Sequence, residues 1–406
     1  MTTEAEAPPA EGAGAGRWPI LFGVWLVYFS FGMITASMAP LVAPIRADFA
    51  VGNAVMGAIL GSWPVSYILA AIPCGMLLDR LGARRMLAIA CVIMAASVLA
   101  RGLAQTPLQL FFAVALFGAG GPMISVGAPM VIARLFQGKT RATAMGLYVT
   151  GPYMGGLVSL AVTNSLLMPL TGGEWRGVMA IHAGLVLLSG AIWLTVSMRR
   201  IAGARFTDDD GSKKYNPGAF AEILAVPRVQ LILVISVGIF FINHGFNNWM
   251  PEILRARGFS AVEAGYWAAI PPAVGILGVL VIPRIAAGAR GVLVLGALFA
   301  AVLLASLLLQ TQAGPPLAAG LILQGLARGS MMTVAIMLLM DTPGVPAERL
   351  GLAGGMFFAA AEIGGVLGPV TFGVLAGLTG GFVAPLAAVS VLCLGLFALL
   401  ARLRRG

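Results

Sequence analysis

The stretch Gly75-Met-Leu-Leu-Asp79-Arg80-Leu-Gly82-Ala-Arg84-Arg85 decides how this chain folds. It is a short charged segment between two apolar runs, which begin near residue 54 and end near residue 104, and each run is long enough to cross a bilayer. We therefore expect a tight loop at a membrane face, with Gly82 supplying the turn. Short loops rich in Lys and Arg stay in the cytoplasm, so the three arginines assign this loop to the cytoplasmic side.

The composition independently indicates a membrane protein. Hydrophobic residues make up 59% of the 406 residues and charged residues only 10%, which excludes an ordinary soluble domain. The net charge of +10 lies mostly in short loops between apolar runs. We therefore expect a lipid bilayer, and no nucleic acid, as the partner of these charges. Cys74, Cys91 and Cys393 all lie in apolar stretches, where they are expected to pack without forming disulfides.

The sequence contains no pattern that predicts an enzyme or a cofactor site. There is no phosphate-binding Gly-Lys-Ser/Thr loop, which argues against ATP-driven transport. Two histidines and three cysteines are too few for a dedicated metal site, and no nucleophile–base set can be defined. We expect neither catalysis nor a bound cofactor.

Twelve apolar segments predict an all-α membrane protein with two six-helix bundles. The expected spans are 18–41, 54–78, 86–104, 108–134, 142–168, 175–197, 229–250, 262–286, 291–311, 315–340, 350–378 and 381–401. They divide the chain into a disordered cytoplasmic tail (1–17), an N-terminal bundle (18–198), a cytoplasmic linker (199–228), a C-terminal bundle (229–401) and a second cytoplasmic tail (402–406).

The distribution of positive charge predicts the orientation. With both termini in the cytoplasm, 19 of the 25 Lys and Arg residues fall in cytoplasmic segments, four fall outside, and two lie within spans. The inverted orientation would place those 19 residues outside, against the positive-inside rule. We therefore expect a multi-pass protein of a bacterial-type inner membrane, with both termini cytoplasmic.

The two halves of the chain repeat each other. A shift of 208 positions places Arg141, Gly146 and Gly156 on Arg349, Gly354 and Gly364, and Leu170-Thr-Gly-Gly173 on Leu378-Thr-Gly-Gly381. The match runs without a gap from the fifth span onto the eleventh. A repeat of this kind predicts a binding site between the halves, near the middle of the membrane.

The charged loop resembles the signature loop of the major facilitator superfamily, G-x-L-x-D-R-x-G-x-R-R. The matching residues are Gly75, Leu77, Asp79, Arg80, Gly82, Arg84 and Arg85. The resemblance implies a transporter that works by alternating access, in which Gly75, Asp79, Arg80, Gly82, Arg84 and Arg85 form a gating latch between the halves. We expect it to act as a monomer. The equivalent C-terminal loop at 283–290 has Arg284 and Arg290 but no acidic residue, so only the N-terminal latch is complete.

Within that superfamily the chain is most similar to the cyanate/nitroimidazole permease branch. The similarity rests on its length, its short central loop, Trp175-Arg176 before the sixth span, and the segment from His244 to Pro251. Members of the branch often have an arginine in the first span, and this chain has none there. Binding of an anion would therefore depend on Arg328.

The fifth span contains Gly151-Pro152-Tyr-Met-Gly155-Gly156, which resembles a G-P-x-x-G-G motif often associated with antiporters. Small residues let membrane helices pack closely, and proline bends them. We interpret Gly151, Pro152, Gly155 and Gly156 as helix-packing residues at the seam between the halves, and do not take the motif as proof of efflux.

Two charged residues lie near the middle of spans, where insertion scales give a cost of about 2.5–3.5 kcal/mol for a charge. Arg328 lies in the tenth span and Glu362 in the eleventh. One interpretation is a structural ion pair within the C-terminal half. The other makes Arg328 the counter-ion of an anionic substrate, because a guanidinium binds carboxylates in a bidentate way. Glu362 would then hold Arg328 between turnovers or carry a proton, and Gln324 shares the face of Arg328.

Further candidates lie in the seventh span and in the first half. Asn243, His244 and Asn247 form an unusually polar stretch for a membrane helix, which favours a cavity. In the first half, Tyr28 lies in the first span, and Trp63 and Tyr67 share one face of the second, deeper than an interfacial aromatic belt. Arg101 lies near the outer end of its span, where we expect its side chain to reach water.

Together these residues predict a secondary transporter of a small organic or inorganic anion. The substrate would bind between Arg328 and Gln324 on one side, and Trp63, Tyr67, Tyr28, Asn243, His244 and Asn247 on the others, with any proton coupling through Glu362 or His244. The alternative within the superfamily is a proton-driven exporter of drug-like compounds. An alternative of another class is a membrane sensor that transports nothing.

Overall fold

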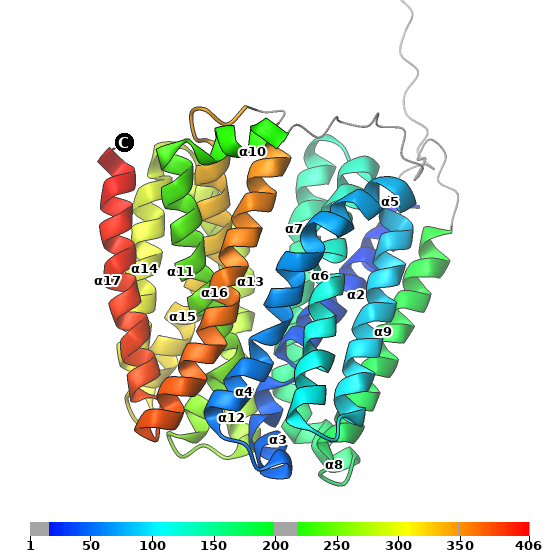
Figure 1. Ribbon diagram of the computed structural model, residues 1–406, viewed down its shortest axis with the longest axis vertical. Helices are drawn as coiled ribbons and strands as arrows, with labels where there is room; N and C mark the ends of the chain where they lie inside the picture. The colour runs from blue at the N-terminus through cyan, green and yellow to red at the C-terminus, as the bar shows by residue number, and fades with distance from the viewer. Residues whose placement is uncertain (1–15, 199–216, 347–348, 406) are drawn as a thin grey trace, which may run out of the picture.

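The computed structural model describes residues 16–198, 217–346 and 349–405, and all the regular secondary structure in these ranges is helical (Figure 1). The expected tail at 1–15 and most of the expected linker, at 199–216, lie outside the described residues. Within the described part, twelve helical segments are long and apolar enough to cross a membrane. They coincide with the twelve spans that the sequence predicts, so the expected fold class is confirmed.

The N-terminal bundle is built from the first six spans. Its elements are α2 (Arg17–Ala36), the 3-10 turn η1 (Ala39–Leu41), α3 (Val42–Phe49), α4 (Asn53–Leu60), α5 (Ser62–Leu103), α6 (Pro107–Leu135), α7 (Gly138–Val162), the π-helical turn η2 (Thr163–Leu167), α8 (Met168–Leu170) and α9 (Trp175–Ser197). The second span begins with α4 and continues into α5, which also contains the third span and is interrupted at Gly82, where φ is 74°. A positive φ favours glycine, so this residue makes the reversal at the charged loop.

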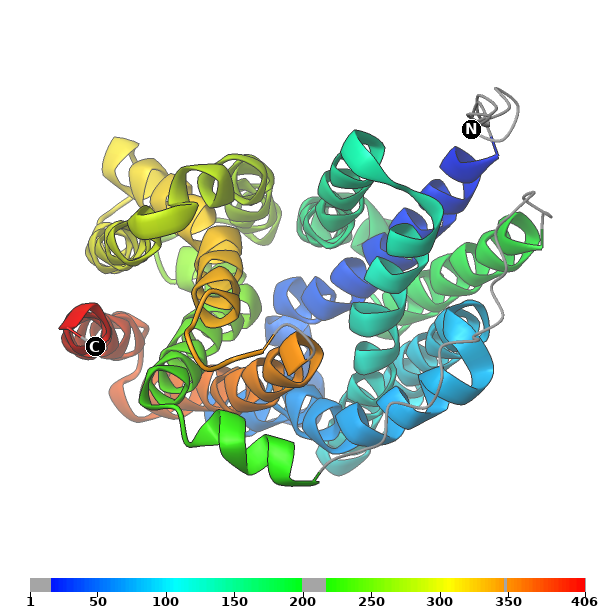
Figure 2. The ribbon, with the colours of Figure 1, turned by 90° about the horizontal axis from the view of Figure 1, so that it is seen from above.

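The C-terminal bundle repeats this arrangement after a short connecting helix. Its elements are α10 (Pro217–Leu224), α11 (Pro227–Arg255), α12 (Ala261–Ala268), α13 (Ile270–Ala286), the 3-10 turn η3 (Gly288–Arg290), α14 (Gly291–Leu308), α15 (Pro315–Met340), α16 (Leu350–Thr379) and α17 (Val383–Arg405). Helix α10 lies across the face on which α2 begins and α17 ends (Figure 1). We call this face the termini face and the opposite one the far face; Figure 2 shows the bundles side by side from the termini face.

The internal repeat is visible in the backbone. Gly172 and Gly380, which are 208 positions apart, both have a positive φ, of 65° and 71°. Gly156 in α7 packs near the backbone of α2, and its counterpart Gly364 in α16 packs against the backbone of α11. The fifth helix of each half therefore contacts the first helix of the same half, as expected for a duplicated unit.

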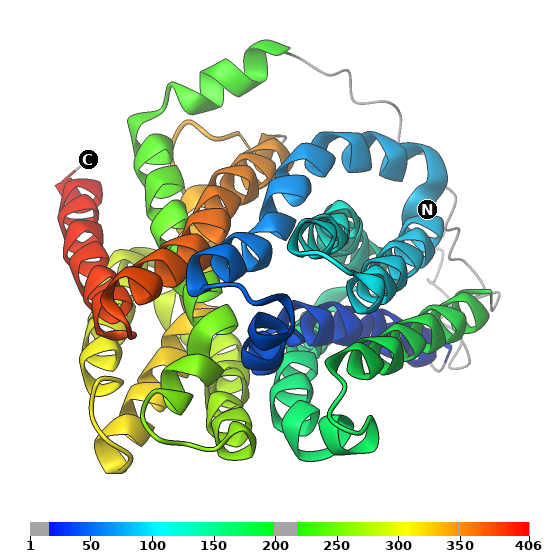
Figure 3. The ribbon, with the colours of Figure 1, turned by 60° about the horizontal axis from the view of Figure 1, so that its bottom comes forward.

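The two halves meet closely at the far face, where α4 crosses α16 (Figure 3). A Cβ added to Gly57 would lie 2.6 Å from the carbonyl oxygen of Pro369, and a Cβ added to Gly373 would lie 3.0 Å from the Cα of Gly57. Glycines at a crossing let two membrane helices approach to backbone contact. Nearby, Asn164 donates from Nδ2 to the carbonyl oxygens of Pro40 and Ala261, both at 3.2 Å, and so links the halves.

Candidate functional site

Arg328 is held by two asparagines that lie one turn apart on α11. Its Nη2 donates to Oδ1 of Asn247 at 2.5 Å, and Nδ2 of Asn243 donates to its backbone carbonyl at 3.2 Å. Residues four apart share a helix face, which is why the pattern in the seventh span brings both amides to α15. Among the described residues, no carboxylate forms an ion pair with Arg328, so its guanidinium has a neutral partner.

Asn247 also reaches the other half of the molecule. Its Nδ2 donates to the carbonyl oxygen of Thr35, at 3.3 Å. Thr35 lies in the last turn of α2, where carbonyl groups have no partner within the helix. One buried amide therefore joins Arg328 of the C-terminal bundle to α2 of the N-terminal bundle.

Glu362 lies beside His244 and apart from Arg328. Its Oε2 is 3.9 Å from Nε2 of His244, and the residue is only 3% exposed. A Cβ at Gly365 would collide with both side chains, so a glycine at this position makes room for the pair. Neither Oε2 of Glu362 nor Nδ1 of His244 has a hydrogen-bond partner among the described residues. A buried acid and imidazole in contact can exchange a proton.

Aromatic side chains of the N-terminal half cover this pair. The rings of Trp63 and His244 stack at 5.1 Å between centroids, across the two halves. Tyr67, one turn further along α5, shares a hydrogen bond of 2.7 Å with Ser125. Tyr28 stacks on Tyr148 at 5.5 Å. The structure thus places Trp63 against the C-terminal site. Tyr67 interacts electrostatically with Glu362 of that site, whereas Tyr28 interacts with other tyrosines of its own half.

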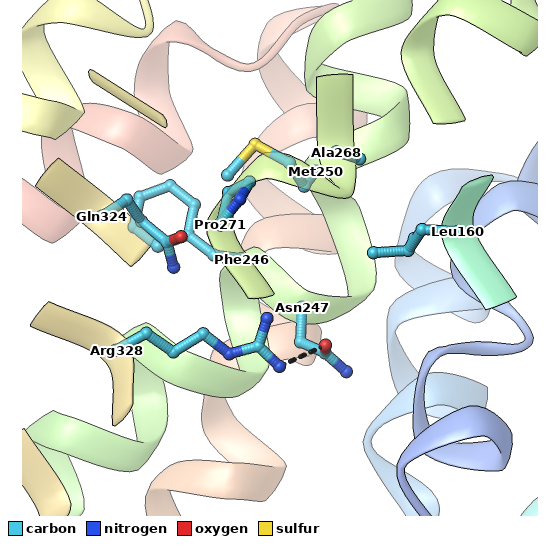
Figure 4. Close-up of a pocket in the computed structure, with 8 residues that line it drawn as sticks. All are labelled: Leu160, Phe246, Asn247, Met250, Ala268, Pro271, Gln324 and Arg328. Atoms are coloured by element: carbon cyan, nitrogen blue, oxygen red, sulfur yellow. Dashed lines mark hydrogen bonds between the residues drawn. The ribbon is translucent and has the colours of Figure 1, made fainter. Parts of the chain in front are cut away.

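A small cavity separates the halves next to Arg328 (Figure 4). It is lined by Leu160, Phe246, Asn247, Met250, Ala268, Pro271, Gln324 and Arg328, and its volume of about 10 Å³ is on the order of one water molecule. Arg328 and Gln324 approach it from α15, and Leu160 approaches from α7 of the other half. In this conformation the cavity is too small for an organic molecule.

Three buried oxygen atoms of the predicted site residues have no donor among the described residues, and one of them belongs to Gln324, which lines the cavity. They are Oε1 of Gln324, which is 1% exposed, Oδ1 of Asn243, and Oε2 of Glu362. An unpaired buried polar atom is costly, on the order of 1–3 kcal/mol, and such atoms are rare in native structures. A ligand that brings hydrogen-bond donors would satisfy them.

Comparison with known proteins shows the family of the chain. A model of the Major Facilitator Superfamily matches residues 21–314. The chain belongs to this superfamily. As in other members, it is a secondary transporter that spans the membrane many times.

Its relatives in the superfamily are distant. The chain is 25% identical over 359 residues to "Uncharacterized transporter YycB" of Bacillus subtilis, covering 88% of this chain and 86% of that protein. It is 24% identical to "Probable galactarate/D-glucarate transporter GudP" of the same organism, covering 93% and 90%. It is also 24% identical to "Quinolone resistance transporter" of Acinetobacter baumannii, covering 59% of each chain.

Among solved structures, the nucleoside transporter NupG matches with a TM-score of 0.74 and 15% identity. The match covers 96% of this chain and 98% of that one. At this identity the likeness concerns the fold alone, and it supports the twelve-helix arrangement.

The superfamily's signature loop is described only in part. At Gly75 and Asp79 the structure describes the backbone alone, so the latch interactions of Asp79 with Arg80, Arg84 and Arg85 stay a prediction. The backbone of the loop has one clear anchor, since Nε1 of the buried Trp193 on α9 donates to the carbonyl oxygen of Arg84 at 3.0 Å. This contact holds the start of the third span against the sixth.

The glycine motif of the fifth span does not pack where the sequence suggested. Gly151 and Gly155 contact the backbone of α2, and Pro152 lies against Gly32, all within the N-terminal half. The residue that faces the other half is Tyr153, whose hydroxyl touches Gly329 and whose ring touches Gly275. The correction follows from helix geometry, because Tyr153 lies about 200° around α7 from Gly151.

Tyr153 is a site residue that the sequence reasoning missed. It interacts electrostatically with Arg328, one residue before Gly329 on α15. The signal that could have found it is its position inside the glycine motif, on the face that the glycines do not use.

The prediction for Arg101 was wrong. Its side chain does not reach water but is 2% exposed, where Nη1 donates to Oγ of Ser37 at 3.3 Å and the guanidinium lies 5.5 Å from the ring centroid of Phe117. The position of Arg101 near the end of its span predicted an exposed side chain. However, α2 and α6 cover the face of the third span on which Arg101 lies. Arg101 is therefore a buried cation that lies next to Phe117, whose ring packs against Trp63 of the site.

Proposed function

We propose that this transporter carries a small organic anion that bears hydroxyl groups as well as a carboxylate, such as an acidic sugar derivative. The observation that carries the proposal is that the guanidinium of Arg328 has no carboxylate partner among the described residues and lies near two unpaired acceptor oxygens. One belongs to Gln324, which lines the same cavity, and the other to Asn243, which is hydrogen-bonded to the backbone of Arg328. The carboxylate would bind Arg328 in a bidentate way. The hydroxyl groups would donate to Gln324 and Asn243.

The similarity to GudP supports the same substrate class, because galactarate and D-glucarate are polyhydroxylated dicarboxylates. The residues of the site do not support cyanate, the substrate suggested by the resemblance to the cyanate/nitroimidazole permease branch. Cyanate has no hydroxyl groups, and it would leave the acceptor oxygens of Gln324 and Asn243 unsatisfied. We therefore prefer the sugar acid to the small inorganic anion.

We further propose that the protein works as a monomer in a bacterial-type inner membrane with both termini in the cytoplasm. The positive charge of the short loops on the termini face supports this orientation. The far face is then external, and the structure corresponds to a state closed on that side. Alternating access would rock the halves about the cavity.

Proton coupling is proposed to involve Glu362 and His244. The two side chains lie within 3.9 Å of each other in a buried position, and Trp63 covers His244 from the opposite half. Rocking of the halves would move this cover and expose the pair to the other side. A carboxyl group that meets water on alternate sides can carry a proton.

A drug exporter is the second candidate, and the specific observation that favours it is the similarity to the quinolone resistance transporter. A cationic compound would need Glu362 and tolerate the loss of Arg328. The substrate charge therefore separates the two candidates.

The experiment is a thermal-shift screen of the detergent-purified protein with D-glucarate, galactarate, cyanate and a lipophilic cation, followed by uptake into liposomes. D-glucarate at 100 times its Kd should stabilise the protein by about 2.7 kcal/mol. Arg328→Gln should abolish the shift, and Arg328→Lys, which retains the charge without the planar fork, should weaken it. A shift by the lipophilic cation alone, unchanged in Arg328→Gln, would overturn the proposal in favour of the exporter.

A further inference from the structure

We propose that Asn247 stands in for the substrate in the empty transporter, and that an anion releases the two halves from each other by displacing it from Arg328. The inference rests on the proposed function, since it assigns the anion to Arg328. It goes further in giving Asn247 a role in coupling. Asn247 positions Arg328 in the empty transporter, and when an anion binds to Arg328, the contact of Asn247 with α2 is weakened.

The first step is that one planar amide serves two partners on different halves. Oδ1 of Asn247 accepts from Arg328 at 2.5 Å, while Nδ2 donates to the carbonyl oxygen of Thr35 at 3.3 Å. The two atoms belong to one rigid group, so Oδ1 cannot move away from the guanidinium without moving Nδ2. Loss of the first hydrogen bond therefore weakens the second.

The second step is that the anion needs the place that Asn247 occupies. Asn247, Arg328 and Gln324 line the same cavity, whose volume of about 10 Å³ cannot hold an organic molecule (Figure 4). The cavity can enlarge only if a lining side chain moves. A carboxylate is the stronger partner for a guanidinium, because it carries the opposite charge and can accept two parallel N–H···O bonds, whereas the amide oxygen of Asn247 accepts one bond from Arg328.

The third step is that the released contact belongs to the closed side. Thr35 lies at the end of α2 that leads to the far face, where α4 crosses α16 and Asn164 links η2 to α12. Among the described residues, the side chain of Asn164 donates to two backbone carbonyls and forms no hydrogen bond with Arg328. Asn247 therefore responds to the binding of an anion at Arg328. Asn164 is a matched control, because it is also an asparagine that joins the two halves but has no hydrogen bond to Arg328.

The reporter for the test is a single cysteine at Leu160, in a chain whose cysteines at 74, 91 and 393 are replaced by alanine. Leu160 is 2% exposed at the seam, where its carbonyl oxygen meets Gly265 of the other half. The rate of maleimide labelling of Leu160→Cys in the purified protein measures how often the seam opens. The probe ligand is D-glucarate, and its affinity is measured on the same samples by calorimetry.

In the reporter chain, D-glucarate should raise the labelling rate several-fold. Asn247→Leu should label fast without ligand, show no further rise with D-glucarate, and bind it with unchanged to about tenfold tighter affinity, because no internal partner must be displaced. Asn247→Asp should bind D-glucarate at least tenfold more weakly, because its carboxylate pairs with Arg328. Asn164→Leu should also label faster, but it should retain the rise with D-glucarate.

Two outcomes would overturn the inference. One is a slow, D-glucarate-responsive labelling rate in Asn247→Leu, as in the parent reporter chain. The other is a tenfold loss of affinity in Asn247→Leu with unchanged labelling, which would make Asn247 a plain substrate contact. If Asn247→Leu does not fold, Asn247→Ser provides the same comparison with a shorter polar side chain.

A separate arm without ligand distinguishes failure of this inference from failure of the proposed function. Arg328→Gln removes the guanidinium that holds Oδ1 of Asn247, so it should raise the labelling rate whatever the natural substrate is. A raised rate with no binding of D-glucarate to the parent chain would support the coupling role of Asn247 and reject the sugar acid. An unchanged rate in Arg328→Gln would reject the coupling role.

Discussion

The imidazole of His244 stacks on the indole of Trp63, with ring centroids 5.1 Å apart and an angle of 23° between the planes. The first residue belongs to the C-terminal bundle and the second to the N-terminal bundle. On its other side, His244 stacks on Phe240 and lies next to Glu362. The aromatic ring of Trp63, from the N-terminal half, therefore covers the pair formed by Glu362 and His244. When the two halves move relative to each other, the environment of this pair will change.

The space at Gly365 predicts a sharp local effect. Gly365→Ala would place a Cβ 2.9 Å from Nδ1 of His244 and in collision with Oε2 of Glu362, and both side chains must then shift. We expect uptake to fall at least tenfold while the protein still folds. Gly354→Ala on the same helix is the control, since an added Cβ there meets nothing within 4 Å. Equal uptake in the two variants would show that the geometry of the pair is irrelevant to transport.

Glu362→Gln tests proton coupling without changing the size of the side chain. Glutamine cannot carry a proton, so uptake of D-glucarate driven by an imposed pH gradient should be lost. Exchange of substrate across the membrane without a gradient should persist, because it needs no net proton movement. The measurement compares the two modes in the same liposomes, and normal gradient-driven uptake in the variant would exclude Glu362 as the carrier.

The crossing of α4 and α16 predicts a change in conformational preference. Gly373→Val would drive side-chain atoms into the backbone of Asn53 and Gly57, so the far face cannot close fully. Overpacking of this kind typically costs about 1–3 kcal/mol. We expect a lower melting temperature and faster labelling of Leu160→Cys. Gly395→Val in α17, where an added Cβ meets nothing within 4 Å, should change neither.

The anchor of the signature loop predicts a modest loss of stability. Trp193→Phe removes the hydrogen bond to the carbonyl oxygen of Arg84 and leaves that acceptor unpaired, which should cost about 1–3 kcal/mol. Trp18→Phe is a matched change at a half-exposed tryptophan and should cost little. Thermal unfolding in detergent measures both. If Arg84 takes part in the latch, Trp193→Phe will also lower the transport rate, whereas Trp18→Phe will not.

The sequence by itself determined the fold of this protein. Apolar runs of membrane length, a charged loop with a glycine at its turn, and a repeat of 208 positions predict twelve spans in two related bundles, since a chain in lipid must satisfy its backbone within helices. It also singled out Arg328, Glu362 and the polar stretch at 243–248, because charged and amide side chains are costly in a membrane unless they have a use.

Only the tertiary structure decided which of these residues meet. It paired Arg328 with Asn247 rather than with Glu362, placed Glu362 against His244, and brought Tyr153 and Thr35 of the first half to the site. It also buried Arg101, which position along the span had placed in water. The periodicity of a helix fixes which residues share a face, but the crossing of two helices far apart in sequence decides which faces touch.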